Sequence, residues 1–157
     1  TNCGIASFRT WKSFVMVWRL LGVVDKWGTI VNIGAKWSHE SWNRDHTWEL
    51  VHKLDKPANN FSVIAFEPSV ADFNATRSRI RRSFSQPLLS RTTLLNQFAQ
   101  PAHIMWQLRE HRVPSSFHLL KVDVDSIDWQ LTVAILDHFS PALLFVEFQV
   151  WTPLPLA

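Results

Sequence analysis

Three aspartates follow an apolar stretch in the second half of the chain. The mainly apolar run 119–124 ends in a cluster of carboxylates formed by Asp123, Asp125 and Asp128. A buried strand has no structural use for carboxylates at its end, and open α/β sheets bind ligands at the carboxyl ends of their strands. We therefore take Asp123 and Asp125 as candidate catalytic residues, which could accept a proton or contact a ligand.

A glycine and a glutamate end two earlier apolar runs. Gly34 follows the β-branched run 29–33. A glycine here would let a ligand approach the main chain, and the amide groups that follow could bind an anion. Glu67 follows the run 61–66, where a carboxylate could accept the hydroxyls of a ribose or cap the next helix. The full dinucleotide fingerprint with three glycines is absent.

Alternating strands and helices must position these residues. Apolar patterning predicts strands at 29–35, 61–66, 92–98, 119–124 and 141–148, helices at 47–54, 70–80, 101–111 and 129–139, and an irregular basic loop at 81–90. The side chains of residues 125–128 are expected to cap the last helix. This order predicts an α/β fold of the Rossmann-like, doubly wound type, with a mainly parallel sheet and helices on both faces.

The domain organisation is predicted from length and patterning. The 157 residues suit one domain at 28–157, preceded by an N-terminal helical segment at 1–27 whose apolar stripe runs from Trp11 to Leu21. No apolar run is long enough to span a bilayer, so we expect a soluble protein. The first residue, Thr1, is not Met, which is typical of a processed or trimmed terminus and leaves an organellar location open after removal of a targeting segment.

Charge and cysteine content narrow the chemistry further. The single cysteine excludes an internal disulfide and a cysteine metal cage, and we expect no metal site. The net charge is +3, and between Asp72 and Glu110 the chain has no acidic residue. Six arginines in or beside this span form a basic belt: Arg77, Arg79, Arg81, Arg82, Arg91 and Arg109. The belt indicates a surface for phosphates, anionic lipid or an acidic partner, or simply a solvated helix face, and no nucleic-acid motif accompanies it.

Four segments carry a resemblance to a known family. They are Val31-Asn32-Ile33-Gly34-Ala35, Ala65-Phe66-Glu67-Pro68, the run from Lys121 to Asp128, and Val146-Glu147-Phe148-Gln149. In order and spacing they resemble the FkbM-like branch of the S-adenosylmethionine-dependent methyltransferases, especially its divergent protist and algal relatives. The resemblance covers residues 29–149.

The family resemblance implies a cofactor, S-adenosylmethionine, and the residues that would bind it. By similarity, Asn32, Gly34 and Ala35 would form the cofactor turn, Glu67 would hold the ribose, and Asp123 and Asp125 would face the amino-acid end of the cofactor or the acceptor. The chain departs from the family pattern in four places. Lys36-Trp37 follows the turn where small residues are usual, Asn32 stands where such strands often carry an acid, and Ser126 replaces a frequent glycine. The terminal antiparallel strand pair is also expected to be lacking.

Three functions remain open at this point. The first is methyl transfer to the hydroxyl of a small-molecule acceptor. The second is a catalytically inactive, methyltransferase-like structural subunit of a larger assembly, which an organelle could house and whose protein partners would cover the sheet edge and the basic belt. The third, ranked lower, is a metal-dependent glycosyltransferase that uses Asp123-x-Asp125. The first two are discriminated by whether Lys36, Trp37 and Trp42 fill the space of a nucleoside.

Overall fold

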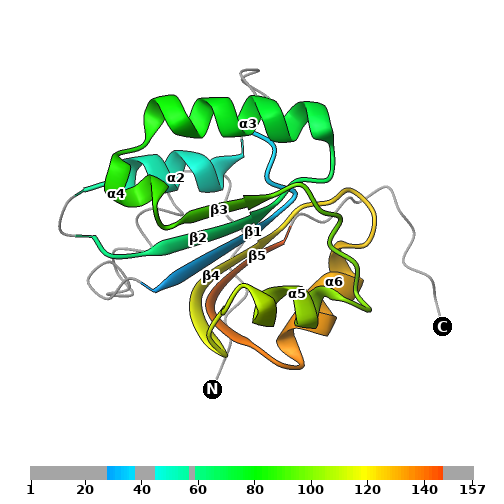
Figure 1. Cartoon of the computed structure of the whole chain (residues 1–157). Helices are drawn as coiled ribbons and strands as arrows, with labels where there is room; N and C mark the ends of the chain where they lie inside the picture. Colours follow the sequence, from blue (N-terminus) through cyan, green and yellow to red (C-terminus); the bar gives the residue numbers. More distant parts are fainter. Residues whose placement is uncertain (1–27, 38–44, 57–58, 147–157) are drawn as a thin grey trace.

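One parallel sheet forms the centre of the molecule. The computed structural model describes residues 28–37, 45–56 and 59–146. Within them, five strands pair in the order β3-β2-β1-β4-β5, and every pair is parallel (Figure 1). The strands are β1 (Thr29–Ile33), β2 (Ser62–Phe66), β3 (Thr92–Leu95), β4 (Ser116–Val122) and β5 (Ser140–Val146). The predicted α/β fold with a parallel sheet is therefore confirmed.

Helices cover both faces of this sheet. On one face lie α2 (His46–Leu54), α3 (Val70–Ser83) and α4 (Gln86–Leu89), and on the other lie α5 (Ile104–Glu110) and α6 (Asp128–Leu136) (Figure 1). Strands covered on both sides must be apolar on both sides. In β1, Ile30 joins the core under α2 and α3, whereas Val31 and Ile33 join the core under α5 and α6. The doubly wound arrangement is thus built into the strand sequences.

The basic segment after residue 80 is more ordered than its sequence predicts. The predicted loop at 81–90 is wrong, because α3 continues through Arg81 and Arg82 to Ser83 and α4 follows at once. Two arginines suit the last turn of a helix, since they face the negative end of its dipole. The Ser85 side chain accepts a hydrogen bond from the Leu88 N–H and so begins α4.

Several other element boundaries also differ from the expectation. The third strand ends at Leu95, and α5 begins at Ile104 after a turn. The prediction that a polar side chain caps α6 is wrong. Ile127 occupies the N-cap position, and no side chain makes a capping hydrogen bond there. The Asp128 carboxylate instead accepts a 2.7 Å hydrogen bond from the Val124 N–H, so it fixes the turn after β4.

The strand register aligns the carboxyl ends of the strands. Ile33 pairs with Phe66 and with Val122, Phe66 pairs with Leu95, and Val122 pairs with Val146. The residues after these strand ends therefore meet at one edge, which we call the carboxyl edge; they include Gly34, Glu67, Asn96 and Asp123. The strand order reverses between β1 and β4, which makes this edge the topological switch point where such sheets bind ligands.

The two ends of the chain lie outside the described residues. The predicted helix at 11–21, the segment 1–27 that contains it and the chain after Val146 belong to these parts, so the expected lack of a terminal antiparallel pair stays a prediction. Among the helices that are described, none has the length and apolar character to cross a bilayer.

Candidate functional site

The turn at Gly34 is tightly packed against the ends of β2 and β4. Gly34 has a positive φ of 78°, and the N–H groups of Gly34 and Ala35 both donate 3.0 Å hydrogen bonds to the Phe66 carbonyl. The Asp123 carbonyl lies against Gly34, where any Cβ atom would collide with it. The glycine is thus required by the chain's own main chain. The sequence predicts instead that a ligand approaches at this point, and that role stays a prediction.

A buried charge cluster lies beside this turn, on the α2 side of the sheet. It consists of Asn32, Asp45, Lys121 and Asp123. Lys121 Nζ donates to the Gly34 carbonyl at 2.6 Å and lies 3.0 Å from an Asp123 carboxylate oxygen and 3.4 Å from one of Asp45. Asn32, the register partner of Lys121, donates a 2.7 Å hydrogen bond to the same Asp45 oxygen. The cluster therefore joins β1, β4 and the start of α2.

The electrostatics of the cluster keep Lys121 charged. Burial lowers the pKa of Lys121, but the carboxylates of Asp45 and Asp123 outweigh it, so the pKa of Lys121 is raised above its ordinary value. The side chains of Lys121 and Asp45 are each 3% exposed, whereas that of Asp123 is 27% exposed. Asp123 is therefore the charged member of the cluster that a ligand could reach.

Glu67 lies at the end of β2 and contacts the first turn of α3. Its side chain accepts a 2.9 Å hydrogen bond from the Ser69 N–H, and the residue is 5% exposed. Asn96 donates to the Glu67 and Pro68 carbonyls and so fixes this corner from β3. Burial raises the pKa of the Glu67 carboxyl above its ordinary value, while the Ser69 N–H lowers it. The contact agrees with the helix-terminus alternative, and ribose binding stays a prediction.

Asp125 differs from the other carboxylates at this edge in its backbone. It has a positive φ of 63° and is exposed. A non-glycine residue in this left-handed region is uncommon, although aspartate tolerates it better than most. The structure therefore places Asp125 in the same loop as Asp123 but outside the buried charge cluster.

The two bulky residues after the turn take different positions. Trp37 is 5% exposed and stacks on Trp48, with ring centroids 5.9 Å apart, in the core between the sheet and α2. The backbone N–H of Trp37 donates to Thr76 Oγ1 of α3 at 2.9 Å. Lys36 is exposed and pairs with Asp72 at 3.4 Å. Trp37 is thus a core residue under α2 and α3, and Trp42 lies outside the described residues.

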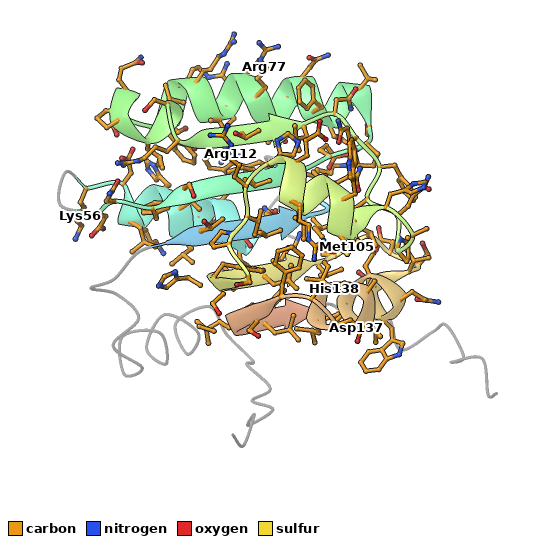
Figure 2. The ribbon with its side chains drawn as sticks, turned by 60° about the horizontal axis from the view of Figure 1, so that its bottom comes forward. Lys56, Arg77, Met105, Arg112, Asp137 and His138 are labelled. Atoms are coloured by element: carbon orange, nitrogen blue, oxygen red, sulfur yellow. The ribbon has the colours of Figure 1, made fainter. Side chains whose placement is uncertain are left out.

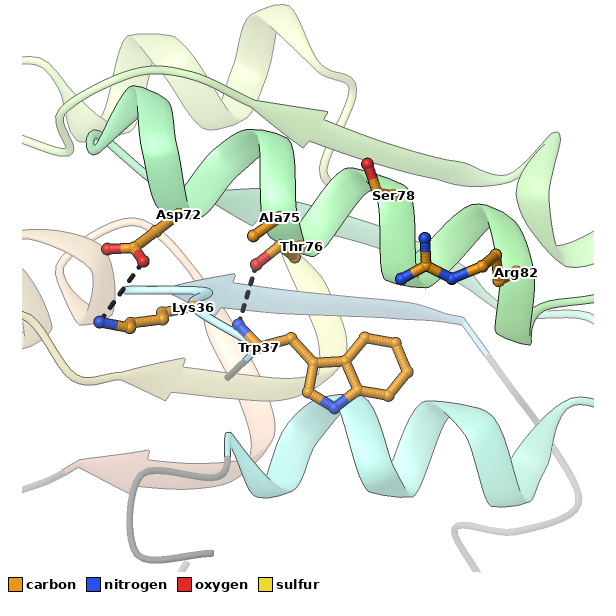
Figure 3. Close-up of a pocket in the computed structure, with 7 residues that line it drawn as sticks. All are labelled: Lys36, Trp37, Asp72, Ala75, Thr76, Ser78 and Arg82. Atoms are coloured by element: carbon orange, nitrogen blue, oxygen red, sulfur yellow. Dashed lines mark hydrogen bonds and ion pairs between the residues drawn. The ribbon is translucent and has the colours of Figure 1, made fainter. Parts of the chain in front are cut away.

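A hollow of about 240 Å³ runs along α3 next to these residues (Figure 3). It is lined by Lys36, Trp37, Asp72, Ala75, Thr76, Ser78 and Arg82. Small side chains on α3 leave this space open between the Lys36–Asp72 pair at one end and Arg82 at the other (Figure 3).

Sequence reasoning missed two members of the charge cluster as site residues. Lys121 carries the clearer signal, because a single cation interrupts the buried run of β4 between Leu120 and Val122. Asp45 precedes a predicted helix, as a typical N-cap residue does, and it does accept the Thr47 N–H at 2.7 Å. Its pairing with Lys121 has no sequence signal.

Two other chemistries need side chains at this edge, namely proton transfer by a histidine and binding of a metal ion. His118 lies near the amino end of β4 and accepts a 2.9 Å hydrogen bond from the Gly28 N–H, far along the strand from the carboxyl edge. Within the described ranges, no three His, Cys, Asp or Glu side chains gather as ligands for a metal ion. Asp123 of the Asp123-x-Asp125 pair is engaged by the Lys121 ammonium, which would oppose a cation at the same carboxylate.

The residues at the carboxyl edge match part of what S-adenosylmethionine requires. The carboxylates of Glu67 and Asp123 suit the ribose hydroxyls and the amino group of that cofactor. Its carboxylate would need donors, and the N–H groups of Gly34 and Ala35 already donate to Phe66. The residue types therefore match the hydroxyl groups and the amino group of the cofactor. Its carboxylate would find donors only if the turn at Gly34 opened.

Comparisons with protein-family models, with curated proteins and with solved structures find no match for this chain.

Proposed function

We propose that the chain is an S-adenosylmethionine-dependent methyltransferase-like domain that transfers a methyl group to the hydroxyl of a small-molecule acceptor. One observation supports this most directly. Gly34, Glu67 and Asp123 follow three register-matched strand ends at the topological switch point of a parallel sheet. A ligand at this point would contact the tight turn at Gly34, the Glu67 carboxylate as an acceptor for ribose hydroxyls, and the partly exposed carboxylate of Asp123.

In this proposal each residue has a distinct task. The bound cofactor supplies an electrophilic methyl group on its sulfonium. Glu67 accepts the ribose hydroxyls through the carboxylate oxygen that does not accept the Ser69 N–H, and ligand binding uncovers this oxygen, because the residue is 5% exposed in the free chain. Asp123, held by Lys121, orients the amino-acid end, and the exposed Asp125 accepts the proton of the acceptor hydroxyl. Most of the rate gain would come from positioning the acceptor in line with the methyl group.

A second candidate is a domain that keeps the fold without the activity. The tight turn favours it, because the Asp123 carbonyl occupies the space beside Gly34 and the amides of Gly34 and Ala35 both bond to Phe66. A fold does not by itself carry an activity. Such a chain would act as a structural subunit in a larger assembly. The glycosyltransferase alternative has no comparable observation in its favour.

Calorimetric titration with S-adenosylmethionine and S-adenosylhomocysteine separates the two candidates. We expect micromolar binding that is lost in Glu67→Ala and kept in Glu110→Ala, an exposed glutamate at the end of α5. Circular dichroism of each variant controls for folding. If the folded protein releases no heat with either compound, the methyltransferase proposal is wrong and the inactive subunit is the remaining candidate.

A further inference from the structure

The six arginines of the basic belt do not form one surface. Arg91 holds a loop, since it donates to Asn60 Oδ1 at 2.7 Å and to the Asn59 carbonyl at 3.2 Å. Arg79 lies over the Trp37 ring, 4.4 Å from its centroid. Arg109 lies on α5, in the other helix layer. The belt therefore reduces to the arginines that α3 presents outward: Arg77, Arg81 and Arg82.

These outward arginines have no acidic partners in the described part of the chain. All three are exposed, and no carboxylate described in the structure lies within ion-pair distance of them. The one acidic residue of α3, Asp72, pairs with Lys36. Figure 2 shows Arg77 projecting from the outer side of α3, away from the sheet. The positive charge of this helix is thus available to an external anion.

The outward arginines are continuous with the hollow on α3. Residues advance by about 100° around a helix, so Ser78 and Arg82 lie between the hollow and the outer side that carries Arg77 and Arg81. Both Ser78 and Arg82 line the hollow. The surface therefore passes from a recess, which has the Lys36–Asp72 ion pair at one end and Arg82 at the other, onto a ridge with two further guanidinium groups.

We propose that this surface of α3, which comprises Arg77, Arg81, Arg82, Ser78 and the hollow, binds the phosphate backbone of a nucleic acid without reading or stacking its bases. A guanidinium group matches a phosphate with two parallel hydrogen bonds. One phosphate enters the hollow beside Arg82, and neighbouring phosphates along the strand meet Arg81 and Arg77. The inference is independent of the proposed methyltransferase activity.

The residue types on this surface favour a nucleic acid over the other anions. Phosphate contacts come mainly from Arg, Lys, Ser and Asn side chains, and the exposed residues here include Asn74 and Ser78 besides the arginines. A membrane-binding helix would need apolar residues beside the charges, but the exposed large apolar residue of α3, Val70, lies in its first turn. Protein partners are held mostly by buried Trp and Tyr anchors besides Arg, and α3 has neither Trp nor Tyr, whereas contacts to phosphates alone need no such anchor.

Fluorescence anisotropy of a labelled RNA strand of about 20 nucleotides tests the proposal on the full chain. Each phosphate contact contributes about 0.7 to the salt slope of single-strand binding, so Arg81→Gln/Arg82→Gln should lower that slope by about 1.4 and weaken binding about 25-fold near 0.1 M salt. Ser78→Glu, which adds a carboxylate beside Arg82, should weaken binding in the same direction.

The matched control is Arg109→Gln/Arg112→Gln, which removes two exposed arginines from the other helix layer. We expect this variant to bind RNA as the unchanged chain does. No binding, equal loss in both double variants, or equal competition by poly-glutamate would overturn the assignment. Binding to anionic phospholipid vesicles without binding to RNA would also overturn it, and would identify the partner as a membrane.

Discussion

The carbonyl oxygen of Asp123 lies against Gly34, where a side chain would have to be. This contact joins the ends of β1 and β4 across the switch point of the sheet. It is reinforced from both sides, because the Asp123 N–H donates to the Ile33 carbonyl and the Gly34 N–H donates to the Phe66 carbonyl, each at 3.0 Å. The glycine is therefore needed for the packing of the carboxyl edge whether or not a cofactor binds there.

Gly34→Ala should destabilise the fold strongly. The positive φ of 78° is unfavourable for alanine, and the new Cβ atom would have to displace the main chain of Asp123. Together these effects should cost about 2–5 kcal/mol of the free energy of unfolding, measured by urea denaturation. Gly28→Ala is the comparison and should cost less, because its Cβ atom would meet the side chain of His118 rather than main chain. Equal stability of Gly34→Ala and the unchanged chain would contradict the close contact.

Lys121→Met should also destabilise the protein, by about 3–5 kcal/mol, because it leaves the buried carboxylate of Asp45 without its cation. Asp45→Asn keeps a good N-cap residue for α2 and removes that charge. The double variant should therefore be more stable than Lys121→Met alone. Urea unfolding of the two single variants and the double variant measures this coupling, and strictly additive effects would show that Lys121 and Asp45 do not interact.

The sequence predicts the sheet and its carboxyl edge because both depend on local patterns. Apolar runs that end in Gly34, Glu67 and Asp123 identify the strand ends, and parallel pairing then brings those ends together. The end of α3 was predicted less well. Arginines are compatible with either a loop or the last turn of a helix. The helix forms here because Ile80 and Phe84 pack against the core.

The buried charge cluster could not be predicted, because it depends on the path of the chain. Asp45 lies 76 residues before Lys121 in the sequence. The pair forms only because α2 begins above β4, next to Asn32. The packing of Trp37 is also a tertiary effect, since its neighbour Thr76 belongs to α3. Sequence patterns therefore predict the elements on which these residues lie, but not the residues that they contact.

Glu67→Gln should stabilise the protein in a pH-dependent way. The pKa of Glu67 is raised in the folded state, so between its ordinary pKa of 4.5 and its folded pKa the folded state binds more protons, and stability falls as pH rises. Glutamine resembles the protonated form and avoids this loss. The gain should be full above the folded pKa and absent below 4.5.

Thermal unfolding of Glu67→Gln and the unchanged chain between about pH 3.5 and pH 8 measures this gain. Glu110→Gln, at an exposed position, should show no such pH dependence. A gain for Glu67→Gln that stays constant across the whole range would point to packing rather than to ionisation.

Trp37→Ala should destabilise the fold and leave the proposed binding of S-adenosylmethionine unchanged. The indole is buried between Trp48 and Phe84, so its loss should cost about 3–5 kcal/mol of the free energy of unfolding. Trp106→Ala, at a residue that is 61% exposed, should change stability by no more than about 0.5 kcal/mol. Because Trp37 packs under α3 rather than at the carboxyl edge, folded Trp37→Ala should bind S-adenosylmethionine as tightly as the unchanged chain. Weaker binding at unchanged stability would instead place this side chain in the ligand site.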